Sequence, residues 1–432
     1  MQCSPMSIFH NIYQGLQDAC YIWRKEMNQV VKDEGVLIFF IIVPLIYPLL
    51  YSWIYNNEVV HEVPVCVVDH SHSQLSRQFI RMCDATPDVK VAYYAQDLDE
   101  AKSLVSRQLV KGIYLIPSSF ASDVYRMQQG TVSVYCDMSL MLTYKAIFQT
   151  AQAVSMEMGS EIQKKLGGHY TAREEAVSTR PLDFDDVPIF SPAAGYGSSI
   201  LPAVLMLILQ QTLVLGIGLS AGTARDENPN RSLVPIGDPR YSTTFPIVLG
   251  KFMCYFMIFM VMGAWLMMAV PHLFHFPQLA TWQSLLAIMV PYVMACIFFG
   301  MMVSCTVKYR ENVMLIVVFV SVPLLFLTGV SWPQSNIPGY WQGVSWLFPS
   351  NFGARAYVRL NSMGASFSDV MFEYRILWIQ TLCYFVLTMA VYRWQFFQAR
   401  LRAKERLDYL KHRRAVRLAK QTEEQQPQSL QS

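Results

Sequence analysis

Long uncharged runs, rich in apolar residues, dominate the hydropathy pattern of this chain. The longest run, residues 252–307, contains no Asp, Glu, Lys or Arg. A transmembrane helix needs about 20 residues, so this run is long enough for two crossings of a bilayer. Pro271, His272, His275 and Pro277 lie near its middle, where we expect the turn of a helical hairpin. The pattern predicts a protein that is integral to a membrane.

Three shorter uncharged runs and an apolar stretch near the C-terminus raise the number of expected crossings to six. The predicted spans are residues 35–55, 192–219, 246–270, 284–306, 313–331 and 372–392. The predicted fold class is therefore an α-helical polytopic membrane protein. Residues 332–364, before the last span, are too long for a turn and contain Pro333, Pro338 and Pro349. We expect them to form a re-entrant or interfacial hairpin on the outer face.

Lys and Arg are concentrated in alternate connecting segments, which predicts the orientation of the spans. With the N-terminus inside, the inner segments contain Arg24, Lys25, Lys32, Arg225, Arg231, Arg240, Lys251, Lys308 and Arg310. The outer segment 271–283 contains neither Lys nor Arg, and residues 332–371 contain only Arg355 and Arg359. Both termini are thus predicted to be cytoplasmic, and residues 56–190 to be extracytoplasmic.

The composition predicts a sizeable water-facing part, because 53% hydrophobic residues and a mean hydropathy of +0.27 are low for a wholly membrane-embedded helical protein. Residues 56–190 supply that part, since their pattern is polar and mixed. Strand-like runs occur at 63–68, 89–94, 112–116 and 131–136, and helical spacing occurs at 73–83, 98–110, 120–127 and 142–165. This alternation predicts a small α/β domain inserted between the first and second spans.

Polar residues at the ends of the predicted strands raise the question of chemistry. Asp69 and Asp137 follow two strands, where an acidic side chain either belongs to a catalytic or metal site or caps the next turn. We favour capping, because no G-x-S-x-G, H-E-x-x-H or paired-carboxylate pattern accompanies them. His70 and His72 are close in sequence, but a histidine pair in a loop is weak support for a metal. We expect no catalytic residue, no metal site and no cofactor.

The order of parts resembles the ABC-2 type transporter permeases, in the branch that carries a large periplasmic domain and is often described as multidrug efflux. The segments that carry the resemblance are 63–77 (VPVCVVDHSHSQLSR), 112–120 (GIYLIPSSF) and 134–139 (VYCDMS). The second span, 201–221, leads into Arg225, Asp226 and Glu227, as the family's second span leads into a charged cytoplasmic loop. Asn228, Pro229 and Asn230 depart from the glycine–threonine pattern expected after those charges.

The resemblance implies the permease subunit of an ATP-binding cassette exporter, moving a hydrophobic or amphipathic drug, lipid or envelope component across a bacterial inner membrane. It implies a separate ATPase subunit, and the absence of G-x-x-x-x-G-K-[ST] from this sequence agrees. It also implies a second permease, identical or homologous, and admits a periplasmic adaptor protein. Membrane lipids are further expected partners, and nucleic acid is not. The alternative is a non-transporting membrane receptor or scaffold whose external domain binds a partner.

The pattern of spans and charges divides the chain into five parts, and the resemblance identifies the first of them as an elbow helix. These are an amphipathic elbow helix at 1–34, the first span at 35–55, the extracytoplasmic α/β domain at 56–190, a five-helix transmembrane domain at 191–392 and a basic cytoplasmic tail at 393–432. The residues expected to couple to an ATPase are Trp23 and Arg24 in the elbow helix and Arg225, Asp226 and Glu227 after the second span.

Three polar residues deep in the second span are the candidates for the pathway. The candidates are Gln210, Gln211 and Thr212, which either contact substrate or form hydrogen bonds between helices. In both cases we expect their side chains to face protein or a cavity, because a polar group that faces lipid is costly. We favour helix–helix bonding over direct substrate contact.

Overall fold

The computed structural model describes residues 5–55, 60–167, 196–228, 232–235, 238–241, 243–306 and 309–425 of the 432-residue chain. The chain forms two compact units, Asn57–Pro188 (the α/β unit) and Met1–Asn56 with Ile189–Ser432 (the helical unit). Pro229 and Asn230, in the predicted coupling loop, lie outside the described residues.

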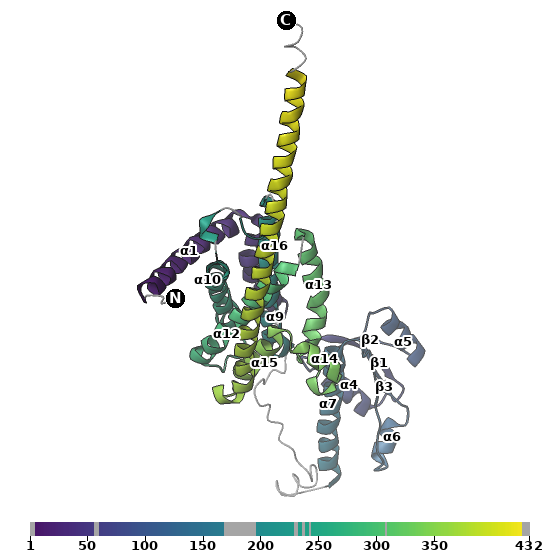
Figure 1. Ribbon diagram of the computed structural model, residues 1–432. Helices are drawn as coiled ribbons and strands as arrows, with labels where there is room; N and C mark the ends of the chain where they lie inside the picture. The colour runs from purple at the N-terminus through teal and green to yellow at the C-terminus, as the bar shows by residue number, and fades with distance from the viewer. Residues whose placement is uncertain are drawn as a thin grey trace. The chain divides into compact units, whose positions relative to one another are not determined.

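A four-stranded sheet organises the α/β unit (Figure 1). Its strands are β1 Val63–Asp69, β2 Val89–Tyr94, β3 Gly112–Ile116 and β4 Ser133–Cys136, in the order β2-β1-β3-β4. Strand β1 runs parallel to β2 and β3, and β4 pairs antiparallel with β3. Strand β1 is internal to the sheet and covered on both faces, which explains its unbroken apolar sequence. The four predicted strands are all present.

Helices cover both faces of this sheet. They are α4 Gln74–Asp84, α5 Leu98–Ser106, α6 Phe120–Tyr125 and α7 Met141–Gly167. One core cluster includes Phe79, Tyr114 and Ile147, and the second, on the opposite face, includes Cys66 and Ala101. Helices α4 and α7 therefore pack on one face and α5 on the other. The predicted helices are present, although α5 ends four residues before the predicted end at 110.

The helical unit contains six helices in its described residues that are long and apolar enough to cross a membrane, as predicted. They are Glu34–Ile54, Gly197–Glu227, Thr244–Leu273, Trp282–Thr306, Arg310–Leu327 and Phe367–Arg414. Two of these spans include a π-helical turn, which widens the helix locally. The protein is thus a multi-pass membrane protein.

The first spans are built from several elements. The N-terminal helix α1 is Pro5–Lys32, and α2 Glu34–Leu37, η1 Ile38–Ile42 and α3 Val43–Ile54 form the first span. The second span is α9 Tyr196–Glu227, followed by η2 Pro239–Tyr241. The third is α10 Thr244–Ala264, η3 Trp265–Ala269 and α11 Val270–Leu273.

The remaining elements follow in order. The fourth and fifth spans are α12 Trp282–Thr306 and α13 Arg310–Leu327. The segment after them forms η4 Gln334–Asn336, α14 Gly339–Ser345, α15 Pro349–Asn361 and η5 Phe367–Val370. The last helix, α16 Met371–Gln425, joins the sixth span to the basic tail without a break and, at 55 residues, is about 80 Å long.

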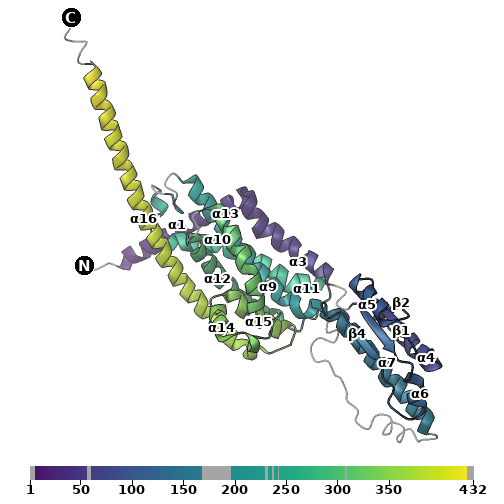
Figure 2. The same cartoon turned by 90° about the vertical axis from the view of Figure 1, so that its right-hand side faces the viewer.

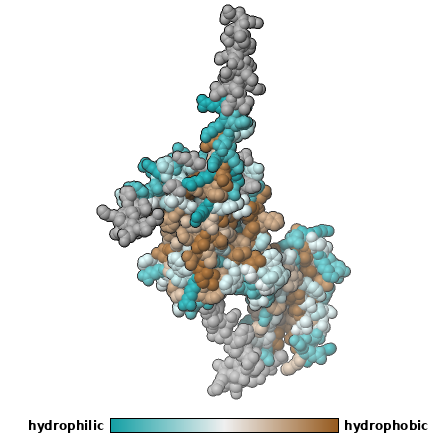
Figure 3. Space-filling model, viewed as in Figure 1, coloured by the Kyte–Doolittle hydropathy of each residue, from teal (hydrophilic) through white to brown (hydrophobic). Residues whose placement is uncertain are grey.

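Helices α9 and α12 form the centre of the bundle (Figure 2). Helix α12 packs against α9, α15 and α16, helices α3 and α13 pack against α9, and α1 lies along α10. A hydrophobic surface covers the spans, with hydrophilic residues beyond it on α16 (Figure 3). This surface is what a lipid bilayer would cover.

Candidate functional site

A buried ion pair attaches α1 to the spans. The side chain of Glu26 on α1 accepts a hydrogen bond from Nζ of Lys251 on α10 at 2.6 Å, and the two side chains are only 5% and 7% exposed. Glu26 also accepts hydrogen bonds from the hydroxyl groups of Ser220 on α9, at 3.0 Å, and of Tyr255 on α10. One carboxylate therefore joins three helices.

The surroundings of Glu26 favour its charged form. Burial by itself raises the pKa of this carboxyl group. The attraction of Lys251 and the hydrogen bonds from Lys251, Tyr255 and Ser220 outweigh burial, so the pKa of Glu26 lies below its ordinary value. A paired, fully hydrogen-bonded carboxylate is tolerated in such a place, whereas an unpaired one is strongly destabilising.

A second carboxylate joins the start of the first span to two other spans. Asp33 caps α2 through the backbone N–H groups of Gly35 and Val36, at 3.0 and 3.3 Å. Its carboxylate also accepts hydrogen bonds from Arg310 at the start of α13, at 2.7 Å, and from Thr223 near the end of α9, at 2.6 Å. Burial raises the pKa of Asp33, but these hydrogen bonds and the charge of Arg310 lower it overall.

Close backbone packing and aromatic contacts complete the attachment of α1. A Cβ added to Gly250 on α10 would lie 2.7 Å from the carbonyl oxygen of Ala19, so only glycine permits this approach of the two helices. The guanidinium group of Arg240 lies 4.1 Å from the ring centre of Tyr21. Helix α1 is therefore held to α10 and to η2 by direct side-chain and backbone contacts.

A polar cavity of about 660 Å³ lies where α1, α2, α9 and α13 meet. Its charged and polar lining residues are Lys25, Asn28, Gln29, Lys32, Asp33, Glu34, Thr223, Glu227 and Arg310. Both signs of charge line this cavity, and it adjoins the ends of three spans.

The residues predicted to couple to an ATPase differ in their exposure to solvent. Asp226 and Glu227 are exposed on the last turn of α9, and Arg24 is exposed on α1. Trp23 is half-buried and packs against the core of the bundle.

Arg225, unlike Asp226 and Glu227, is not exposed. Its side chain is buried, at 5% exposure, and its Nη2 donates a hydrogen bond of 2.7 Å to the carbonyl oxygen of Cys305. Cys305 lies in the last turn of α12, where carbonyl groups lack helical partners and a positive charge is stabilising. Arg225 therefore caps α12 from inside the protein.

An apolar groove of about 510 Å³ runs between the first, second and fifth spans. Its lining includes Tyr47, Tyr51 and Tyr55 on the side of α3, and Val317, Val318 and Val322 on α13. Gln211 and Thr212 of α9 also line it. Among the described residues, Nε2 of Gln211 is buried without a hydrogen-bond partner, whereas the hydroxyl of Thr212 donates to the carbonyl of Ile208 at 2.8 Å.

Gln210 points away from this groove into the bundle. Its Oε1 accepts a hydrogen bond of 2.7 Å from the backbone N–H of Ser350, in the first turn of α15. The N–H groups of a first turn have no partner within their own helix, so the Gln210 side chain supplies one. Gln210 is 2% exposed and acts as a bond between helices.

Sequence reasoning missed two carboxylates, Glu26, which holds α1 to the bundle, and Asp33, which holds the start of the first span. Glu26 lies on the buried stripe of α1 formed with Ala19, Ile22 and Val30, at intervals of three and four residues. Two features of the sequence could have indicated the pair. Glu26 is an acidic residue within an apolar stripe, and Lys251 directly precedes the uncharged run 252–307. Lys251 was expected to be one of the positive charges of the inner segments, but its side chain is buried.

Comparison with known protein families assigns the chain to a family of transporter proteins. A family model described as ABC-2 family transporter protein matches residues 35–390. No curated protein matches the chain. Members of the family are membrane subunits of transporters and normally work with an ATPase subunit. Because the matched region covers most of its length, this chain belongs to the ABC-2 family of transporter proteins.

Proposed function

We propose that this chain is the permease subunit of an ATP-binding cassette exporter, and that ATP is hydrolysed on a separate chain. The observation that carries the proposal is the attachment of α1 to the spans. Glu26 links the amphipathic helix α1 to α9 and α10, and Asp33, directly after α1, links the start of the first span to α9 and α13. A helix that only anchored the chain to a membrane surface would not need a buried ion pair to α10 and a hydrogen bond to α9.

The distribution of charge supports one orientation in a bacterial inner membrane. In this orientation both termini and the polar cavity at Glu227 and Arg310 face the cytoplasm. The α/β unit then lies on the extracytoplasmic side, where an adaptor protein would reach it. Helices α14 and α15 form the re-entrant hairpin on that side, and the basic residues of α16 beyond the sixth span contact anionic lipid headgroups.

We assign the coupling surface to the exposed residues near the polar cavity. A segment of the ATPase docks on Arg24, Asp226 and Glu227, and Trp23 supports α1 from the side of the bundle. Movement of α1 is then transmitted through Glu26 to α10 and through Asp33 to α13 and α9. Arg225 contributes by holding the end of α9 to α12.

We assign the pathway to the groove between α3, α9 and α13. It is lined by aromatic and aliphatic side chains with a few polar groups, a surface suited to a hydrophobic or amphipathic substrate. Gln211 offers a free amide within it, and Thr212 offers a hydroxyl oxygen. A second permease, identical or homologous, facing this groove would enclose it.

The test is recovery of an ATPase with the solubilised permease at native expression level. The Asp226→Ala/Glu227→Ala variant changes only exposed positions, so we expect it to fold and to recover less ATPase than the natural chain. The control is Asp97→Ala/Asp99→Ala, which removes two exposed acidic residues from the α/β unit. If no ATPase is recovered with the natural chain, under conditions that retain other membrane complexes, the exporter proposal fails and a receptor or scaffold is favoured.

A further inference from the structure

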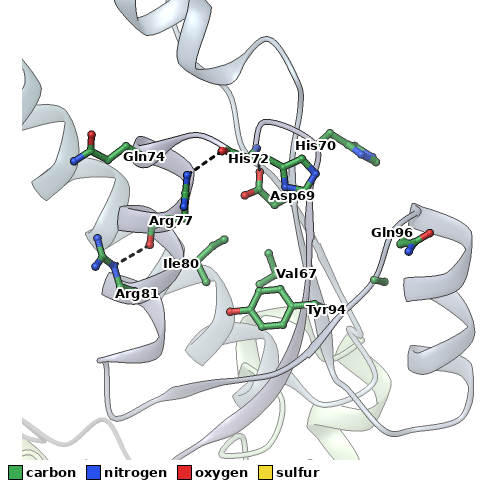
Figure 4. Close-up of a pocket in the computed structure, with 11 residues that line it drawn as sticks. Val67, Asp69, His70, His72, Gln74, Arg77, Ile80, Arg81, Tyr94 and Gln96 are labelled. Atoms are coloured by element: carbon green, nitrogen blue, oxygen red, sulfur yellow. Dashed lines mark hydrogen bonds between the residues drawn. The ribbon is translucent and has the colours of Figure 1, made fainter.

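The α/β unit contains a large cavity that the transport proposal does not use. Its volume is about 1200 Å³, and it lies at the carboxyl ends of β1 and β2, beside α4 (Figure 4). The buried side chains of Val67 and Ile80 form its apolar base. Small molecules bind to open α/β sheets at the carboxyl ends of the parallel strands. The cavity shares that edge of the sheet, although it lies on the side of β2 and not between β1 and β3, where the direction of the strand connections changes.

Two arginines on α4 give this cavity positive charge. Arg77 and Arg81 are four residues apart, so they lie on the same face of the helix, and both line the cavity. The guanidinium group of Arg77 donates to the carbonyl oxygens of Ser73 and His72, at 3.2 and 3.3 Å. Arg81 donates from Nε to the carbonyl oxygen of Arg77, at 3.3 Å. These neutral acceptors orient both arginines and leave their charges uncompensated.

The carboxylate among the residues that line the cavity, Asp69, is already engaged. Asp69 accepts hydrogen bonds from the backbone N–H groups of Ser71 and His72, at 2.9 and 3.1 Å, and from the hydroxyl of Ser76, at 2.7 Å. Asp69 thus stabilises the turn after β1, in agreement with the capping role predicted from the sequence. Among the described residues of the chain, neither Arg77 nor Arg81 forms an ion pair.

An aromatic ring and the loop after β2 form the wall opposite α4. The ring of Tyr94, at the end of β2, is 69% exposed and stands across the cavity from α4 (Figure 4). Gln96, in the loop after β2, also lines the cavity, and Gln74, the first residue of α4, lines it on the side of the arginines. Such groups bind the hydroxyl and ring portions of a small polar molecule, while arginine binds carboxylate or phosphate oxygens through paired hydrogen bonds.

We propose that this cavity binds a small organic anion that carries a carboxylate or a phosphate group. The anion contacts Arg77 and Arg81, and the rest of the molecule lies against Tyr94 and the two amides. The site lies within the α/β unit and needs neither an ATPase nor a transported substrate. Its test is therefore independent of the exporter proposal.

The experiment measures binding of citrate and of glucose 6-phosphate to the purified full-length chain by titration calorimetry, at matched ionic strength. Glucose is the neutral comparison, and hydrogen–deuterium exchange locates the binding. We expect at least one of the two anions to bind, and glucose not to. Exchange should slow in peptides that cover residues 69–81 and 94–96. Each of Arg77→Gln and Arg81→Gln should weaken binding by about tenfold, since each removes charge-assisted hydrogen bonds.

The matched control is Arg107→Gln, which removes an exposed arginine of the same unit that does not line the cavity. It should bind the anion as the natural chain does. The proposal is overturned if neither anion binds, or if Arg107→Gln weakens binding as much as the two cavity variants do. Binding of an oligoglutamate peptide in the absence of binding by either anion would also overturn it and would indicate an acidic protein partner. A melting curve for each variant shows whether weaker binding reflects loss of the fold.

Discussion

The carboxylate of Glu26 lies 2.6 Å from the Nζ atom of Lys251, and neither side chain is more than 7% exposed. The two residues are far apart in sequence, one in an amphipathic helix and the other near the start of the third span. A buried ion pair adds little net stability over apolar packing, because both charges lose their hydration. Breaking it is costly, however, so the pair fixes where α1 lies on the bundle.

Replacing Lys251 alone should destabilise the protein strongly. Lys251→Met leaves the carboxylate of Glu26 buried without its positive partner, and we expect a loss of about 3 to 5 kcal/mol in the free energy of unfolding. Denaturant titration of the purified chain measures this loss. The double variant Glu26→Met/Lys251→Met should recover much of it, because no charge is then left unpaired.

A surface pair provides the control for this prediction. Lys102 and Asp99 are 3.2 Å apart, but their side chains are 58% and 93% exposed. Lys102→Met should therefore leave the unfolding transition unchanged. Equal effects of Lys251→Met and Lys102→Met would contradict the structural role assigned to Glu26.

Acid should remove the contribution of Glu26 to stability. Its pKa is lower in the folded chain than the ordinary 4.5, so the folded state favours the ionised form. That contribution is complete above the ordinary pKa and is lost as the pH falls through the lowered pKa of the folded chain. We expect the melting temperature of Glu26→Gln to lie below that of the natural chain at neutral pH, and the two to converge in acid. A difference that persists unchanged in acid would show that the charge of Glu26 does not matter.

The sequence predicted the elements well where a single physical requirement determines the pattern. Six spans follow from the length of the apolar stretches, because a chain that crosses a bilayer must form helices long enough to span it. Strand β1 was predicted from VPVCVV, since a strand covered on both faces must be apolar throughout. Each of these inferences needs only local sequence and the medium around it.

The side-chain arrangement of the candidate site could not be predicted in the same way. Gln210 and Gln211 are adjacent, yet one bonds to α15 and the other lines the groove, since neighbours on a helix point about 100° apart. Which of them faces the groove depends on how α9 is rotated within the bundle. Arg225 is a similar case, because its partner is the carbonyl of Cys305, in a helix distant in sequence. Such choices depend on tertiary packing.

Adding a methyl group to Gly250 should loosen α1. The new Cβ would lie 2.7 Å from the carbonyl oxygen of Ala19 and 2.9 Å from Cβ of Ile22, both on α1, so Gly250→Ala forces the helices apart. We expect a loss of about 1 to 3 kcal/mol in stability and faster hydrogen–deuterium exchange in peptides from α1. Gly15→Ala is the matched control, because its nearest neighbour would be Cγ of Pro246 at 3.7 Å, an ordinary contact. Unchanged exchange in α1 of Gly250→Ala would contradict the close packing.

Substitutions of Gln210 and of Gln211 should have different effects, the first on stability and the second on transport. Gln210→Leu leaves the backbone N–H of Ser350 buried without an acceptor, and we expect a loss of about 1 to 3 kcal/mol in the free energy of unfolding. Gln211→Leu removes a buried amide that has no partner among the described residues, so stability should be retained or increased. The same change makes the groove more apolar, so it should alter the rate or selectivity of ATP-driven dye export in proteoliposomes.

The contrast between the two variants is the decisive measurement for the groove. Both replace the same side chain by the same apolar one, one residue apart on the same helix, so differences in helix propensity or hydrophobicity cannot account for a divergent result. Lower stability of Gln210→Leu with normal transport per folded molecule, and altered transport by a stable Gln211→Leu, would identify the groove between α3, α9 and α13 as part of the pathway. Unaltered transport by Gln211→Leu would place the pathway elsewhere in the bundle.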